Sequence, residues 1–271
     1  YKSQFEMLKS YELKYKDFEK LKQYCDQKKI IMISTAFDTE STEFLINLNL
    51  KAYKIPSGEI NNFLYLSRLS RLNKPTILST GMSTISDIDN AIRVLEKFGL
   101  GDKNLCILHC HGEYPTKMKD VNLKAMAKIG DVFGRSFGYS DHTIGSQVSI
   151  AAVSLGAKVI EKHFTLDKTQ EGPDHKASVE PFELSKMVKK IRDIETALGD
   201  GFKKPTETEL KNKELVRKSI VASKDILEGD EFTYKNITVK RPSGGIDPMY
   251  WEEILGKKSK KNYLKDDRIQ W

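Results

Sequence analysis

Short apolar segments recur along this chain at a nearly constant interval, which restricts the possible folds more than any other feature. Their starts lie 22 to 30 residues apart, and amphipathic helical patterns fill the intervals. Alternation of short strands with helices is typical of βα units in a parallel sheet. The six predicted strands are residues 30–36, 52–56, 75–79, 105–110, 135–139 and 158–164.

The number of these units bears on how the sheet closes. A (β/α)8 barrel needs eight strands, whereas this sequence supplies six and opens with a helical pattern at residues 4–29. The strands end in polar residues, as barrel strands do. We therefore predict an α/β fold, a (β/α)8 TIM barrel lacking its first two βα units in this sequence. A six-stranded doubly wound sheet is the alternative.

The last part of the chain has a different character. After a helical pattern at 181–198, residues 199–214 are polar and carry Gly and Pro, which is typical of a linker. Short strand-like pieces and turns follow and predict a small β-rich domain. The predicted organisation is a partial barrel over residues 1–198, the linker and a C-terminal domain over residues 215–271.

Charge and composition narrow the class of protein. A formal charge of +7 and a pI near 9.0 would by themselves suit a nucleic-acid binder. Most Lys residues, however, stand beside Glu and Asp on amphipathic helices, and the densest run, residues 257–261, suits a solvated loop. Three cysteines cannot form a disulfide framework, and no apolar stretch reaches the ~18 residues of a membrane span. We predict a cytoplasmic protein with neither a nucleic-acid nor a membrane partner.

Small hydroxyl residues and glycines follow three of the predicted strands. In parallel βα folds, functional groups gather at the carboxyl ends of the strands, so Ser57, Ser79 and Ser140 should share one rim. The glycines after the first two expose backbone N–H groups that can bind phosphate or carboxylate. Lys54 can add a positive charge. One Ser-Gly pair alone is ordinary turn chemistry, but together these residues predict a site for an anionic ligand.

Two histidines end consecutive predicted strands. Neighbouring parallel strands lie about 4.8 Å apart, so the imidazoles of His142 and His163 can reach one divalent metal ion, which would act as a Lewis acid. His109, Cys110 and His111 form a weaker metal candidate, because residues alternate faces along a strand. We interpret His109 as a hydrogen-bonding residue inside the barrel and the cysteines as core.

Carboxylates near the same rim are available for proton transfer or for binding hydroxyl groups. Glu59 and Glu113 follow predicted strands, and Asp174 lies in the polar segment 171–178. The length and polarity of that segment suit a loop that folds over the site, although an ordinary surface loop would look the same.

Six strings of the sequence, taken in order, carry a resemblance to a known family: AYKIPSGEINN, KPTILSTGMST, ILHCHGEYPT, FGYSDHTIG, IEKHFTLD and EGPDHKASVEP. In these the chain resembles the N-acetylneuraminate (sialic acid) synthase family, which also contains the synthases of legionaminic and pseudaminic acids. RKSIVASKDILEGD and ITVKRPSGGIDPMYW are similar to its C-terminal antifreeze-like (SAF) domain. The resemblance covers the chain from about residue 20 onward.

The resemblance implies a role for each candidate residue. His142 and His163 take the positions of metal ligands, for Mn²⁺ or Mg²⁺. The positions implied to bind phosphoenolpyruvate are Thr35, Lys54, Ser57, Ser79 and Ser140, and those implied to handle the sugar are Glu59, Tyr114 and Asp174. Arg241 matches an arginine that the C-terminal domain contributes to the partner's site in a domain-swapped homodimer. The expected catalytic residues are Lys54, Asp174 and Glu59, with Glu59 transferring a proton.

The implied reaction condenses phosphoenolpyruvate with an N-acylated aldose and water, and releases phosphate by C–O cleavage. We predict N-acetylneuraminate synthesis from N-acetylmannosamine, with synthesis of legionaminic acid or a related nonulosonate from a diacetamido-trideoxyhexose as the alternative. A non-catalytic carbohydrate- or phosphate-binding scaffold is the remaining hypothesis. The sequence departs from some family members at His111-Gly112, and a glutamate and a lysine of the family's first two barrel strands have no counterpart here.

Overall fold

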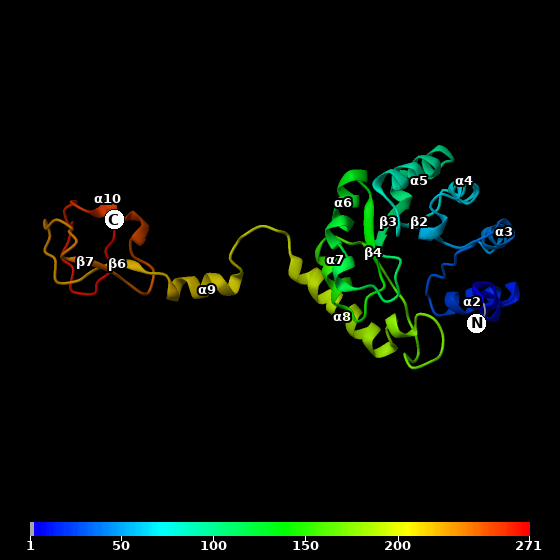
Figure 1. Ribbon diagram of the computed structural model, residues 1–271. Helices are drawn as coiled ribbons and strands as arrows, with labels where there is room; N and C mark the ends of the chain where they lie inside the picture. Colours follow the sequence, from blue (N-terminus) through cyan, green and yellow to red (C-terminus); the bar gives the residue numbers. More distant parts are fainter. Residues whose placement is uncertain (1–2) are drawn as a thin grey trace. The chain divides into compact units, whose positions relative to one another are not determined.

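The computed structural model describes residues 3–271, which divide into two compact units (Figure 1). The first unit ends at Gly199, and the second runs from Asp200 to Trp271. The strands of the first unit are β1 (Tyr53–Ile55), β2 (Thr76–Ser79), β3 (Leu105–Cys110), β4 (Ser136–Asp141) and β5 (Val159–Lys162). Its α-helices are α1 (Gln4–Tyr11), α2 (Tyr15–Gln27), α3 (Thr39–Asn47), α4 (Phe63–Ser70), α5 (Ile85–Lys97), α6 (Leu123–Phe133), α7 (Gln147–Ser154) and α8 (Pro181–Leu198).

A five-stranded parallel sheet organises the first unit. The strands pair in chain order, β1-β2-β3-β4-β5, and helices α4 to α7 connect them. Figure 1 shows a curled sheet, as in half of a barrel. The predicted parallel α/β architecture is confirmed, and α8 has the predicted bounds.

Side chains alternate between the two faces of this sheet, because successive residues of a strand point to opposite sides. Leu78 and Ile107 are fully buried on the face that α4 and α5 cover, in one core with Leu66 and Leu95. The other face carries polar residues near the carboxyl ends of the strands, such as Ser79 and Ser140. The helix-covered face therefore supplies the packing that holds the strand ends in place.

Residues 30–36, predicted as a strand, form no strand in the structure. Ile30 and Ile31 are 63% and 60% exposed. A strand needs the hydrogen bonds of a neighbour, and within the sheet β1 pairs only with β2. The segment has the apolar composition of a strand but no partner, so the described sheet has five strands and not six.

The second unit is a small β-containing fold with its own core. Its elements are α9 (Glu207–Val216), β6 (Ser219–Ala222), β7 (Ile237–Lys240) and α10 (Trp251–Ile254). Strands β6 and β7 are antiparallel, and Ile220, Phe232 and Ile269 are buried in a cluster that includes Ile254 of α10. This cluster shares no buried residue with the core of the first unit.

Helix α9 occupies much of the stretch predicted as a linker. It forms there because Thr206 and Glu209 make a capping box: each side chain accepts a hydrogen bond from the backbone N–H of the other. Across residues 3–271, no helix combines the length and the apolar character that crossing a membrane requires.

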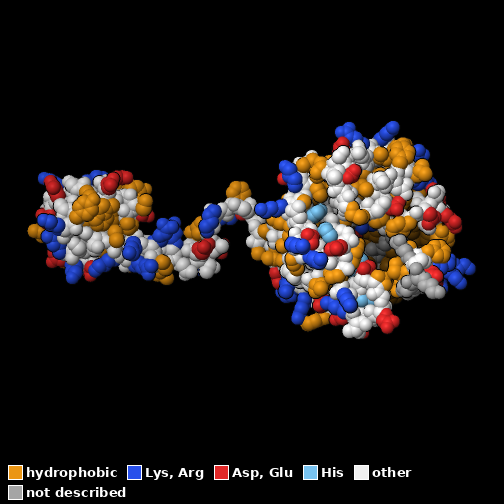
Figure 2. All heavy atoms as spheres, viewed as in Figure 1, with side chains coloured by type: hydrophobic (Ala, Val, Ile, Leu, Met, Phe, Trp, Pro, Cys, Tyr) orange, Lys and Arg blue, Asp and Glu red, His pale blue; other side chains and the backbone are white. Residues whose placement is uncertain are grey.

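Charges of both signs are interspersed on the face of the first unit that Figure 2 shows. Arg93 pairs with Asp89 at 2.6 Å and Lys189 with Asp193 at 2.8 Å, each one helical turn apart. Such exposed pairs contribute little to stability. They show instead that these basic residues are matched locally by acidic neighbours, as the sequence pattern predicted.

Candidate active site

A cavity of about 200 Å³ lies where the carboxyl ends of the strands meet, and we name it the rim pocket. Six of the predicted site residues line it: Lys54, Ser57, Ser79, Tyr114, Ser140 and His142. The other lining residues are Pro56, Gly58, Met82, Cys110, His111, Gly112 and Glu161. The structure thus brings together most of the predicted anion-binding residues and one of the two histidines.

Lys54 and Glu161 form the charged centre of the rim pocket. Lys54 Nζ lies 2.7 Å from one carboxylate oxygen of Glu161, and Ser140 Oγ donates to the other oxygen at 2.6 Å. Burial disfavours the charged carboxylate, but Lys54, Ser140 and His142 outweigh burial, so the pKa of Glu161 lies below its ordinary value. Glu161 is therefore ionised at neutral pH and pairs with the ammonium of Lys54.

His142 presents an unprotonated nitrogen to the rim pocket. Its Nδ1 lies 2.7 Å from the carbonyl oxygen of His111, which can only accept, so Nδ1 carries the proton of the neutral ring. Nε2 lies 3.2 Å from Ser140 Oγ, whose hydrogen is already donated to Glu161. Burial lowers the pKa of His142, so the ring is neutral at neutral pH and Nε2 keeps a free lone pair.

Tyr114 and Asp174 surround the second histidine. The ring centres of His142 and His163 are 5.2 Å apart, and the Tyr114 ring lies 4.0 Å from the first and 5.1 Å from the second. Asp174 Oδ2 is 3.6 Å from His163 Nδ1. Burial, with smaller effects of nearby acidic groups, raises the pKa of Tyr114 to about 12, so its phenol stays protonated. The two imidazoles and the phenol therefore share one corner of the site.

These histidines fit a metal ion in part. A ring held through Nδ1 by a carbonyl oxygen, with Nε2 free, is how metal-binding imidazoles are commonly oriented, and His142 has this arrangement. Within residues 3–271, no group of three or more His, Cys, Asp and Glu side chains is arranged to hold a metal ion. An ion between His142 and His163 would therefore take its remaining ligands from substrate or water.

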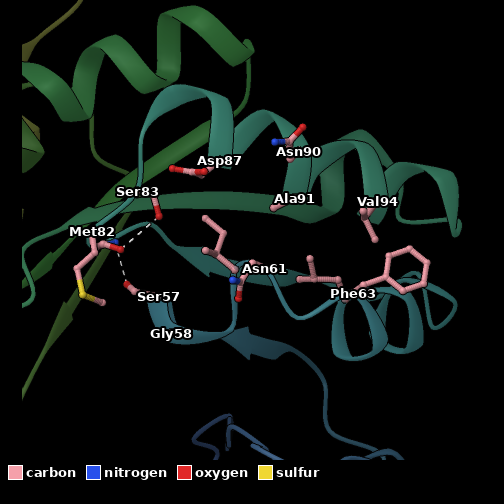
Figure 3. Close-up of a pocket in the computed structure, with 13 residues that line it drawn as sticks. Ser57, Gly58, Asn61, Phe63, Met82, Ser83, Asp87, Asn90, Ala91 and Val94 are labelled. Atoms are coloured by element: carbon pink, nitrogen blue, oxygen red, sulfur yellow. Dashed lines mark hydrogen bonds between the residues drawn. The ribbon is translucent and has the colours of Figure 1, made fainter.

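Ser57 and Ser79 supply hydroxyl groups to the rim pocket. Ser57 Oγ accepts a hydrogen bond from the backbone N–H of Gly81 at 2.8 Å, and Ser57 also borders the neighbouring cavity drawn in Figure 3. A Cβ atom at Gly81 would come within 2.9 Å of Ser57 Oγ, so a larger residue there would have to displace the Ser57 side chain. Ser79 Oγ is buried without a hydrogen-bond partner in the described protein. Because a buried hydroxyl without a partner is unfavourable, a ligand oxygen in the pocket would stabilise this arrangement.

Four predicted site residues of the first unit do not line the rim pocket: His163 and Asp174, which adjoin it beside Tyr114, and Thr35 and Glu59. Thr35 lines a different cavity, of about 730 Å³, together with residues of α2 and α3. The carboxylate of Glu59 accepts a hydrogen bond from Asn62 Nδ2 at 2.5 Å, and Glu59 does not line the rim pocket. Arg241 is exposed and belongs to the second unit.

Glu161 is the residue of this site to which sequence reasoning assigned no role. It stands two positions before His163, and residues two apart on a strand point to the same face. That period of two, applied to the end of β5, would have indicated that Glu161 faces the same side as His163.

The interpretation of His109 as a residue inside the barrel is wrong. His109 pairs in register with Tyr139, on the helix-covered face, and its Nε2 lies 3.1 Å from the Val121 carbonyl oxygen. Cys110 instead lines the rim pocket, with its sulfur 3.2 Å from Ser57 Oγ. The two residues do alternate, but the sequence alone did not reveal which face the helices cover.

Known proteins match both units of the chain. Residues 1–203 match the model of the NeuB family, and residues 217–271 match the SAF domain. An N,N'-diacetyllegionaminic acid synthase of Campylobacter jejuni is 50% identical over 268 residues, covering 99% of this chain and 80% of that protein. Human N-acetylneuraminate-9-phosphate synthase is 35% identical over 261 residues, covering 95% of this chain and 72% of that protein.

A solved structure agrees with these sequence matches. The N-acetylneuraminic acid (sialic acid) synthetase of Leptospira borgpetersenii, in complex with citrate, superposes with a TM-score of 0.71 at 32% identity, covering 76% of this chain and 72% of that one. The family resemblance carried by the sequence motifs is therefore confirmed. The chain is an enzyme of the synthase type that belongs to the NeuB family and ends in an SAF domain.

Proposed function

We propose that this chain makes a nine-carbon sugar acid from phosphoenolpyruvate, an N-acylated aldose and water, with release of phosphate. One observation carries the proposal: the hydrogen-bonded network of Lys54, Glu161, Ser140 and His142 lies in the rim pocket of a NeuB-family chain. The network combines a cation, an ionised carboxylate and a neutral imidazole. These are the groups that a condensation between an anionic enol phosphate and an aldehyde requires.

Lys54 and the pocket hydroxyls suit the two anionic groups of phosphoenolpyruvate. An ammonium is a compact charge that pairs with phosphate, and hydroxyl groups donate to phosphate or carboxylate oxygens. Ser79 Oγ has no hydrogen-bond partner within residues 3–271, so it has a hydrogen bond to give. Ser57 and Ser140 line the same cavity. Thr35 lies along a separate cavity, so we leave it out of this anion site.

His142 and His163 are the proposed ligands of a divalent ion, Mn²⁺ or Mg²⁺. When bound, such an ion supplies Lewis-acid polarisation of the aldehyde oxygen. The chain itself presents the free Nε2 of His142 and keeps His163 beside Asp174. The protonated phenol of Tyr114, next to both rings, can donate a hydrogen bond to an oxygen of the sugar.

The reaction forms one carbon–carbon bond and, at C2 of phosphoenolpyruvate, replaces the carbon–oxygen bond to phosphate by one to a water oxygen. C3 of phosphoenolpyruvate attacks the aldehyde carbon, and the aldehyde oxygen takes up a proton. A water oxygen adds at C2 and loses a proton, and phosphate then leaves C2 to give the keto acid. We assign acceptance of the water proton to Glu161, which is ionised and lines the rim pocket, in place of Glu59, whose carboxylate is bound by Asn62.

The sugar we propose is a diacetamido-trideoxyhexose, so that the product is a legionaminic acid. Support comes from the 50% identity to a legionaminic acid synthase, against 35% to a synthase of N-acetylneuraminate 9-phosphate. This reverses the order predicted from the motifs, which surround the shared chemistry and not the far end of the sugar. N-acetylmannosamine is the second candidate, supported by the similar sialic acid synthetase structure.

Phosphate release with a panel of sugars tests the proposal. The full chain is incubated with Mn²⁺, phosphoenolpyruvate and either the diacetamido-trideoxyhexose or N-acetylmannosamine, and products are identified by mass spectrometry. We expect phosphate release only when a sugar is present, and faster release with the diacetamido sugar. Release that does not depend on sugar, or no release with either sugar, would contradict the proposal.

We also propose that Arg241 acts in the site of a partner subunit, within a homodimer whose C-terminal domains are swapped. Arg241 is exposed in a unit with its own core, which supports a role in contact with another surface. Mixing His142→Ala with Arg241→Ala subunits tests this. In a swapped dimer, random mixing restores about a quarter of the sites, because each mixed dimer has one site with neither substitution. No recovery above the two separate variants would reject the exchange.

A further inference from the structure

Behind the rim pocket, on the helix-covered face of the sheet, Asp141 and Lys162 form a fully buried ion pair. Their charged atoms are 3.2 Å apart, and the side chains are 0% and 3% exposed. Asp141 also accepts hydrogen bonds from Thr143 N at 2.9 Å, Thr143 Oγ1 at 2.7 Å and Ser149 Oγ at 2.6 Å. Lys162 Nζ donates to the carbonyl oxygen of Thr143 as well.

The pair stands directly before both histidines of the site. The strand register pairs Asp141 with Lys162 across β4 and β5, and the next residue on each strand is His142 or His163. The preceding cross-strand pair faces the rim pocket, so side-chain alternation turns Asp141 and Lys162 away from it. The pair therefore joins the ends of β4 and β5 on the helix-covered face, at the last paired position before the two imidazoles.

The ammonium group of Lys162 binds the residues on both sides of His142. Lys162 contacts Asp141, which precedes that histidine, and the carbonyl of Thr143, which follows it. Lys162 is itself joined by a peptide bond to His163. A shift of one strand end relative to the other would therefore break several buried polar contacts at once.

We propose that Asp141 and Lys162 are positioning residues that hold His142 and His163 at the separation one divalent ion requires. The inference rests on the proposed metal-binding role of these histidines. A ligand constellation must be held within about 0.5 Å of its productive geometry, which strand ends joined only by backbone hydrogen bonds do not guarantee. Neither residue touches the substrate or the metal; each acts through the backbone of its neighbour.

The same strand offers a matched control at its other end. Arg135, directly before β4, bonds Glu96 and Asp102 and has a side chain only 11% exposed. Arg135 thus fixes the amino end of β4 through ion pairs, as Asp141 does at the carboxyl end. If these ion pairs only stabilise the fold, losing either one should affect the protein in the same way.

Mn²⁺ binding to the full chain, without substrates, separates the two roles. Asp141→Asn combined with Lys162→Met removes both buried charges while leaving no unpaired ion. We expect Mn²⁺ affinity, measured by calorimetry, to fall about 10- to 100-fold in this variant. Arg135→Met should lower the melting temperature but leave Mn²⁺ affinity within about twofold of wild type, because its strand end carries no ligand.

Two further variants keep every outcome decisive. If the double variant does not fold, Ser149→Ala removes one hydrogen bond to Asp141 and should weaken Mn²⁺ binding a few-fold. Unchanged Mn²⁺ affinity in the folded variant overturns the positioning role. His142→Ala distinguishes this result from failure of the proposed function: if it binds Mn²⁺ as well as wild type, the histidines are not ligands and the positioning role is rejected with them.

Discussion

The two edges of the parallel sheet differ in how their chain segments are held. At the β5 edge, the backbone beyond the strand is bound again, since Val179 N donates to the His163 carbonyl at 2.8 Å and a bridge joins Phe164 to Val179. At the β1 edge, the apolar residues 30–36 form no strand, and Ile31 is 60% exposed. The β5 edge carries His163, next to His142 at the end of β4, and the segment before β1 carries Thr35.

The difference shows what fixes a functional group in this fold. Both segments have strand-like sequence, but residues 30–36 pair with no strand of the described sheet, whereas β5 pairs with β4 and is joined to it by buried side-chain contacts. Hydrogen bonds from neighbours, and not apolar composition, determine whether a segment holds its residues in one position. Thr35, on the unpartnered segment, accordingly lies apart from the residues that converge on the rim pocket.

The largest effect should come from removing the cation of the rim pocket. Lys54→Met takes away the charge proposed to bind phosphate and leaves Glu161 without its cationic partner. We expect kcat/KM for phosphoenolpyruvate to fall about a thousandfold, or about 4 kcal/mol, as when one preorganised electrostatic contact is lost. Steady-state phosphate release measures this. Lys74→Met is the control, because Lys74 lies at the amino end of β2, where it binds Asn49, and its loss should change kcat/KM less than threefold.

The next largest effect concerns stability and compares two isoleucines directly. Ile107 is fully buried in β3, whereas Ile31 lies on the unpartnered segment. Ile107→Ala should lower the free energy of unfolding of the first unit by about 3 kcal/mol, through lost burial and the cavity that remains. Ile31→Ala should change it by less than about 0.5 kcal/mol. Urea denaturation followed by circular dichroism measures both, and equal losses would show that the segment is packed as firmly as the sheet.

The sequence predicted the regular part of this fold well. Residues 105–110 form β3 with the predicted bounds, and this short apolar run pairs with β2 on one side and β4 on the other. The same reasoning failed at residues 30–36. Composition reports the tendency to form a strand, but pairing depends on what lies beside the segment, and the local sequence does not contain that information.

The site was predictable where a residue type has few alternative uses. His142 and Ser140 end a strand and reach the pocket as expected. No role was predicted for Glu161. Its ion-pair partner, Lys54, is more than a hundred residues away in the chain, so the local sequence around Glu161 does not indicate that the carboxylate is paired. Glu59 was predicted to act in the site, and the structure shows its carboxylate bound to Asn62 at the short turn after β1.

A smaller effect is expected at the loop that covers the β5 edge. Asp174 Oδ2 lies 3.6 Å from His163 Nδ1, close enough to orient the ring once a metal ion draws it into place. Asp174→Asn should weaken Mn²⁺ binding about tenfold, or about 1.4 kcal/mol. Asp167→Asn is the matched control in the same loop, because the carboxylate of Asp167 accepts its hydrogen bonds from the neighbouring Thr169 and not from His163. Equal Mn²⁺ affinities in the two variants would remove Asp174 from the site.

The smallest effect tests what holds residues 30–36, the segment that pairs with no strand of the described sheet. Asp38 follows it and caps α3, accepting hydrogen bonds from Ser41 N and Ser41 Oγ, each at 2.7 Å. These bonds lower the pKa of Asp38, so the folded state holds its proton less tightly than the unfolded state. The stabilisation is therefore fully present above the ordinary pKa near 3.8 and is lost as the pH falls through the lowered folded pKa.

Asp38→Ala should accordingly cost about 1 kcal/mol of unfolding free energy at pH 7, as for other N-cap losses, and progressively less below about pH 3.8. Asp38→Asn keeps the cap without the charge, so it should lose less at pH 7 and show no change across the same pH range. Urea titrations at pH 7 and pH 3 give these differences. If Asp38→Ala lowers the unfolding free energy equally at both pH values, the charged cap does not stabilise this segment. The difference between residues 30–36 and the ion-paired β5 edge would then have another physical cause.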